Sequence, residues 1–138
     1  MARTAAMIKV EQTIGYQFRN PELLKSALTA AGADPNNRDG NRKLAQLGQS
    51  VLELAIADEV FDMSHSREEM CTLSSMFRSK PQRAAAADAA EIVDCIELCA
   101  RSGPASNTVK GLAVSAIIGA VWKDSQSMDV VKGAVARL

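Results

Sequence analysis

The chain has 138 residues, with 16 Lys or Arg against 16 Asp or Glu, and its composition is 47% hydrophobic but only 4% aromatic. That length suits one domain with its own core, and a formal net charge of zero excludes the strongly basic tails and faces that drive nonspecific nucleic-acid binding. Three cysteines without framework spacing indicate a reducing, intracellular compartment, and no apolar run reaches the roughly 18 residues that a membrane span needs. We therefore expect one domain over residues 1–138, with residues 1–7 disordered and no membrane association.

The first half of the chain predicts two helices separated by a polar loop. Asn20, Pro21 and Glu22 are typical of a helix start, since they supply a cap, a first-turn proline and a first-turn acid. Residues 33–40 are rich in turn formers and predict a loop. From Asn41 to about Phe61, apolar residues recur at helical spacing and predict a long helix.

The second half predicts four more helical segments. A capping box at 66–69 starts one helix, and Pro81 starts an alanine-rich one. We expect further helices over about 108–122 and from about 127 onward. Four acidic residues recur every three positions after the alanine run, which predicts carboxylates stacked along one side of a helix, either as a solvated face or as a docking surface for a basic partner: Asp88, Glu91, Asp94 and Glu97.

Four segments, in order along almost the whole chain, resemble the ribonuclease III catalytic domain. Residues 14–29 resemble its opening, GYxFxNPxLLxxALTH, and residues 41–54 occupy the place of its signature helix, NERLEFLGDAVLxL. Residues 77–80 look like its LVSN element, and residues 116–124 look like its last core helix, ALIGAVYLD. The resemblance implies an all-α, ribonuclease III endonuclease-domain-like helical bundle.

The family cleaves double-stranded RNA with two Mg²⁺ ions, which are held by acids four apart on the signature helix and three apart on the last core helix. Carried across by alignment, these ligand positions fall on four residues that carry no acid: Ala45, Gln49, Leu112 and Ser115. The family's Glu-Arg pair becomes Arg42 and Lys43, whose charges repel a cation. The sequence therefore predicts no metal, no cofactor and no nuclease activity of its own, while Glu53 and Asp58 are interpreted as helix-surface acids.

Basic residues form two groups that the family fold would bring near the end of the cleft. These groups predict contacts to RNA phosphates, with ordinary surface charge as the alternative: Arg38, Arg42, Lys43, Arg78, Lys80 and Arg83. No double-stranded-RNA-binding domain follows the nuclease-like part, so we expect RNA affinity to require dimerisation or a partner.

The resemblance also implies pairing through the signature helix, with a second copy or with another ribonuclease III-like chain. The expected interface residues are Leu44, Gln46, Leu47, Val51 and Leu54. The family has an aromatic residue at the Gln46 position, where it plugs into the partner subunit. Glutamine there predicts an altered homodimer or a different partner.

The remaining reactive side chains give weak signals. His65 lies just before a predicted helix cap and is interpreted as a turn residue rather than a base. Cys95 and Cys99 are expected one helical turn apart as buried apolar residues, with a metal or redox pair as the alternative.

Several functions stay open at this point. The leading hypothesis is a catalytically inactive ribonuclease III-like subunit that dimerises and acts as a scaffold or binds double-stranded RNA. The alternatives are a metal-dependent endoribonuclease in RNA processing (alone or with an active partner), a structural component of a ribonucleoprotein such as a mitochondrial ribosome, and a helical interaction module without RNA. The expected location is cytoplasmic or nuclear, with a mitochondrial one left open.

Overall fold

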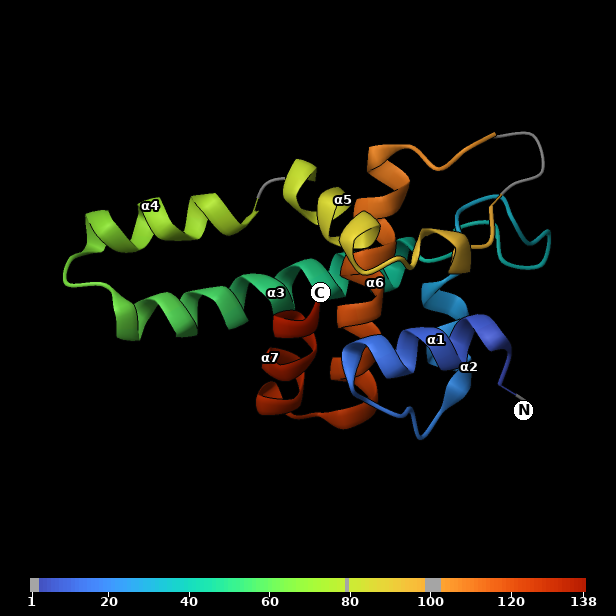
Figure 1. The fold of residues 1–138 in the computed structure, drawn as a ribbon, viewed down its shortest axis with the longest axis horizontal. Helices are drawn as coiled ribbons and strands as arrows, with labels where there is room; N and C mark the ends of the chain where they lie inside the picture. The colour runs from blue at the N-terminus through green and yellow to red at the C-terminus, as the bar shows by residue number, and fades with distance from the viewer. Residues whose placement is uncertain (1–2, 79, 99–102) are drawn as a thin grey trace.

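The computed structural model describes residues 3–78, 80–98 and 103–138, and within these ranges it is helical, without a β-strand (Figure 1). The elements are α1 (Ala5–Ile14), α2 (Pro21–Ala27), α3 (Arg42–Met63), α4 (Arg67–Arg78), α5 (Lys80–Ala89), the 3₁₀ turn η1 (Val93–Cys95), α6 (Asn107–Ser125) and α7 (Met128–Arg137). The predicted all-α fold class is thus confirmed.

The centre of the bundle is α6, which is apolar on all its sides. Every residue from Ala113 to Val121 is buried, because α2, α3, α5 and α7 all pack around this helix. A helix without a polar face is stable in water only when other helices enclose it, so α6 forms the centre of the hydrophobic core. No helix of the described residues is long and apolar enough to cross a membrane.

A long arm projects from this body. Figure 1 shows the C-terminal half of α3 running out past α7, then α4 returning beside it as an antiparallel neighbour. Ser66 caps α4 as predicted, since the Glu69 N–H donates to its hydroxyl over 3.1 Å, while the Glu69 carboxylate accepts from the His65 N–H rather than from Ser66. We call α3 from Leu54 onward, together with α4, the arm.

Two expectations from the sequence are wrong. The N-terminal helix already begins at Ala5, because Thr4 caps it and Met7 is buried in the core, so residues 5–7 are ordered. The second error concerns the acidic stack.

The four acids from Asp88 to Glu97 do not share a helix. After α5 ends at Ala89, Glu91 adopts a left-handed conformation with φ of 58°, and Glu97 lies in a bridge to Thr29. The chain turns here because Ile92, Cys95 and Ile96 reach the core, which outweighs the helix propensity of the alanine run.

Candidate functional site

The two longest helices cross backbone to backbone at glycines. A Cβ atom on Gly48 of α3 would lie 1.6 Å from the Ser115 carbonyl oxygen of α6, and one on Gly119 would lie 2.3 Å from the Leu44 carbonyl oxygen. Glycine is disfavoured in a helix interior, so its presence at both points is explained by this close approach. We call this contact the crossing.

The four positions predicted to replace metal ligands all lie within one helical turn of the crossing. Ala45 and Gln49 are three residues before and one residue after Gly48, while Leu112 is three residues before Ser115, so each lies within about 5 Å along its helix axis. Ala45 and Ser115 are 2% and 3% exposed, Leu112 is half-buried, and Gln49 is exposed.

This set of side chains does not fit a divalent metal ion. Mg²⁺ takes oxygen ligands and is held through carboxylates, whereas the crossing offers two hydrocarbon side chains, one hydroxyl and one amide. Across the described residues, no group of three or more His, Cys, Asp or Glu could hold a metal ion. The four side chains at the crossing therefore do not form a carboxylate ligand set for Mg²⁺.

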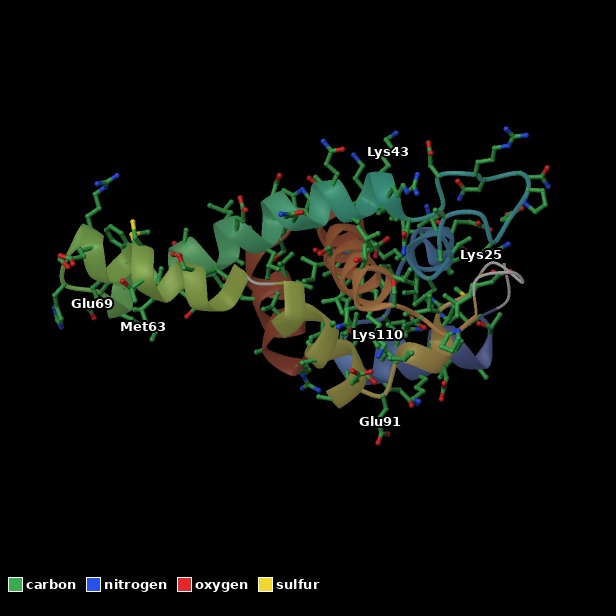
Figure 2. All side chains as sticks on the ribbon, turned by 90° about the horizontal axis from the view of Figure 1, so that it is seen from above. Lys25, Lys43, Met63, Glu69, Glu91 and Lys110 are labelled. Carbon is green, nitrogen blue, oxygen red and sulfur yellow. The ribbon has the colours of Figure 1, made fainter. Side chains whose placement is uncertain are left out.

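A basic end of α3 lies beside the crossing. Arg38, Arg42 and Lys43 are exposed, and none of them has an ion-pair partner among the residues that the structure describes. Figure 2 shows Lys43 projecting from the side of α3 that faces away from α6. The side chains of Arg78, Lys80 and Arg83 lie outside the described part, so only the first basic group has a known placement.

Sequence reasoning missed the role of Asp124, the last residue of the ALIGAVYLD-like segment. Its carboxylate accepts a 2.5 Å hydrogen bond from the Tyr16 hydroxyl and bonds of 2.8 and 2.9 Å from the backbone N–H groups of Arg19 and Asn20. The Asn20 side chain in turn caps α2 by accepting from the Glu22 N–H. We call residues 15–20 the anchored loop.

A second carboxylate holds the anchored loop from its other side. Glu11, which is nearly buried, accepts a 2.8 Å hydrogen bond from the Phe18 N–H and pairs with Arg3 at 3.0 Å. Arg3 also donates to the Phe18 carbonyl oxygen, and Phe18 itself is a core residue. The only sequence signal for Glu11 was a carboxylate on the apolar side of a helix.

These contacts shift the ionisation of both partners at Asp124. Burial raises the pKa of Tyr16 to about 12, helped by the hydrogen bond to Asp124 and by its charge. Burial alone would raise the pKa of Asp124, but the hydrogen bonds from Tyr16, Arg19 and Asn20 outweigh it and lower that pKa. The hydrogen bonds to Asp124 thus hold the anchored loop against the end of α6, and we interpret them as structural rather than catalytic.

The residues predicted for dimerisation differ in their exposure. Leu54 is 58% exposed and Gln46 is also exposed, Leu44 and Leu47 are half-buried, and Val51 packs into the core of its own chain. Phe61 lies at the predicted end of the same helix and is 69% exposed. The seven-residue spacing of Leu47, Leu54 and Phe61 in the sequence could have indicated that Phe61 shares a helix face with the other two.

The other reactive side chains do not converge on the crossing. His65 lies exposed in the turn before α4, with its N–H 3.4 Å from Glu69, and Cys71 is exposed on the arm. Cys95 is buried in η1, where burial raises its pKa, and Cys99 lies outside the described residues. The helix that was expected to join these two cysteines is absent at Cys95, since η1 ends there and Glu97 is in a bridge.

An all-helical bundle with a buried central helix, crossed at glycines by a long helix that continues into an arm, defines the class of protein. Two solved structures of the nuclease domain of ribonuclease III from Campylobacter jejuni share this fold, with TM-scores of 0.85 and 0.83. They are 23% and 24% identical and cover 97% and 94% of this chain, and the alignments include 93% and 92% of theirs. One of them concerns flexibility in a region involved in dimer formation of that domain.

Sequence comparison points to the same family. A ribonuclease 3 of Vibrio vulnificus is 33% identical over 92% of this chain, and one of Ruegeria pomeroyi is 30% identical over 90% of it. The chain spans 57% and 58% of the length of these two relatives. No protein-family model matches the chain. This chain is therefore a homologue of the ribonuclease III nuclease domain, as the sequence motifs had indicated.

Proposed function

We propose that this chain is a catalytically inactive ribonuclease III-like subunit that dimerises and binds double-stranded RNA or acts as a scaffold. One observation carries the proposal: four positions at the crossing hold Ala45, Gln49, Leu112 and Ser115, so no carboxylate stands where the family resemblance calls for metal ligands. Two of these side chains, Ala45 and Ser115, are buried beside the tight helix contact.

Dimerisation is supported by a row of four apolar residues and one serine on the outer side of α3. Five residues follow each other at spacings of three and four, the pattern by which a helix presents one seam to another helix: Leu47, Ser50, Leu54, Ala57 and Phe61. We call this row the outer stripe. Leu54 and Phe61 are among the most exposed large apolar side chains of the described residues, and such side chains in a row favour a partner surface.

The charges along α3 support antiparallel pairing of two copies. Its first turn carries Arg42 and Lys43, whereas its last turns carry Asp58, Glu59 and Asp62. In an antiparallel pair the basic end of each helix lies opposite the acidic end of the other, so the electrostatic terms favour this orientation. The heterodimer alternative, with another ribonuclease III-like chain, uses the same stripe.

RNA binding is supported by the basic end alone. Arg38, Arg42 and Lys43 are exposed and can contact phosphates. Three cations in one chain give weak binding, and a second copy would double the number of phosphate contacts. The relatives are bacterial proteins and lend no support to a mitochondrial location; an intracellular role remains our proposal.

The decisive experiment is a cleavage assay on long double-stranded RNA in Mg²⁺ and in Mn²⁺. We expect no metal-dependent product from the purified chain, and an RNA mobility shift that weakens with added salt. Metal-dependent product that is lost in Ser115→Ala or Gln49→Ala would instead establish the endoribonuclease alternative.

A restored variant provides the matched control. Ala45→Glu, Gln49→Asp, Leu112→Asp and Ser115→Glu together return four acids to the crossing. We expect this variant to be less stable without metal, because it places like charges at a partly buried contact, and to melt higher when Mg²⁺ is added. The unmodified chain should show no such Mg²⁺ dependence of its melting temperature.

A further inference from the structure

A groove separates the outer half of α3 from α7. It has a volume of about 330 Å³ and is walled mainly by hydrocarbon side chains: Ala55, Ile56, Val60, Met63, Val135 and Ala136. Its lining residues come from α3 and α7, at the place where α3 runs out beyond α7 in Figure 1. The α3 wall of the groove belongs to the arm, and Met63 at its outer end is 57% exposed.

The outer stripe lies on the side of α3 opposite this groove. Residues two apart on a helix are separated by about 200° around its axis, so Ile56 lies opposite Leu54, and Met63 lies opposite Phe61. Figure 2 agrees with this arrangement, because Met63 and the outward-pointing Lys43 lie on opposite sides of α3. A second copy that pairs through the outer stripe therefore leaves the groove open.

The rim of the groove is acidic. Asp58 and Glu59 are more than half exposed and share a single cation, Lys132, whose ammonium lies 3.5 Å from Glu59 and also contacts Asp58. Asp62 is exposed one turn further along. This excess of negative charge repels phosphates and attracts a cationic partner.

The α7 wall consists of Lys132, Val135 and Ala136, and Gly133 lies beside it on the same helix. Ala136 is exposed, and a Cβ atom added to the neighbouring Gly133 would meet nothing within 4 Å. Small side chains allow the backbone of another helix to approach closely, while Ile56 and Met63 on α3 supply larger apolar contacts.

We infer that this groove binds an amphipathic helix of a protein partner, with the apolar face of that helix in the groove and lysines or arginines along its flank. The occupant is distinct from a second copy paired through the outer stripe, and it is not RNA. The groove lies on the opposite side of α3 from the outer stripe and does not require dimerisation, although the acids on its rim are those that the antiparallel pairing also uses.

The test uses a synthetic 18-residue peptide in which leucines recur every three or four residues and the other positions are lysine. Controls are the same composition in scrambled order and a version with glutamate in place of lysine. Binding to the ¹⁵N-labelled full chain is followed by amide shifts. We expect saturable binding with shifts centred on Val135 and Ala136, and at least tenfold weaker binding of both control peptides.

Two substitutions separate the groove from the rest of the surface. Ala136→Trp fills the groove and should weaken binding at least tenfold, whereas Ala89→Trp, an equally exposed position on α5, should leave it unchanged. Met63→Ser is a second probe that leaves α7 intact and should weaken binding severalfold. Absence of binding, shifts centred on Leu54 and Phe61, or equal affinity in Ala136→Trp would each overturn the inference.

Discussion

The anchored loop lies at the C-terminal end of α6 and the crossing at its middle, and the two places differ in which residues of the family motifs they retain. At the anchored loop two carboxylates bind several polar groups: Asp124 accepts three hydrogen bonds, and Glu11 accepts from the Phe18 N–H and pairs with Arg3. At the crossing, the glycines that let two helices touch are present, but side chains that could bind a metal are not.

Under the proposed function, this difference means that the fold and the metal chemistry are separable in this chain. Residues that satisfy buried backbone groups or permit close packing affect the free energy of unfolding directly, whereas a metal ligand at a cleft contributes little to folding and often opposes it through charge repulsion. A chain can therefore lose the second kind and retain the fold that its relatives share.

The largest effect is expected from Gly48→Val. Its Cβ would lie 1.6 Å from the Ser115 carbonyl oxygen, a contact that no rotamer change relieves, so α3 and α6 must move apart. We expect a loss of about 4 kcal/mol or more, or failure to fold, measured by urea unfolding. Gly133→Ala is the matched control, because that position is open, and it should stabilise the chain by about 0.5–1 kcal/mol. A tolerated Gly48→Val would show that the crossing is not tight.

The next largest effect is expected from Asp124→Asn, which should cost about 2 kcal/mol, because the neutral side chain weakens three hydrogen bonds. The folded-state pKa of Asp124 is lowered, so its contribution is complete above the unfolded-state value near about 4 and is lost as the pH falls through the folded-state pKa. The stability difference between the two proteins should accordingly be flat from neutral pH to about pH 5 and shrink below about pH 4. A difference that persists unchanged in acid would contradict this role.

The sequence was sufficient for elements whose signals are local. Asn20 caps α2 and Ser66 caps α4 as their side-chain chemistry predicts, and the periodic apolar residues locate α3 within two residues of its observed ends. Alignment to the family motifs also selected Ala45, Gln49, Leu112 and Ser115, and their correspondence to the family's metal ligands stays a prediction.

Contacts between distant segments could not be predicted in this way. Tyr16 and Asp124 are 108 residues apart, and no spacing rule pairs them. Val51 and Leu54 have the same apolar character, yet Val51 is buried and Leu54 is exposed because α6 and α7 cover one side of α3 only. The end of α5 depends likewise on Ile92 reaching the core, which the alanine-rich sequence before it does not reveal.

Tyr16 offers a spectroscopic test of the anchored loop, because it is the one tyrosine in the sequence. The rise of tyrosinate absorbance should have its midpoint at about 12, as burial and the bond to Asp124 raise the pKa. Because the folded-state pKa is raised, the stabilisation is complete below the unfolded-state value near about 10 and is lost as the pH rises through about 12. Asp124→Asn should move the midpoint toward 10 without reaching it, since burial remains. A midpoint near 10 in the unmodified chain would mean that Tyr16 is exposed and not bonded to Asp124 in solution.

The smallest effect is expected from Gln49→Asp, which adds one carboxylate at the crossing just as Asp124→Asn removes one from the anchored loop. Gln49 is exposed and makes no hydrogen bond to another described side chain, so the free energy of unfolding should change by no more than about 0.5 kcal/mol. Its melting temperature should also be independent of Mg²⁺, because one carboxylate among Ala45, Leu112 and Ser115 is too few ligands for that ion. A large loss of stability would mean that the crossing does not tolerate a carboxylate at this position. An Mg²⁺-dependent rise in melting temperature would mean that the crossing still binds the ion, which would contradict the separation of fold from metal chemistry.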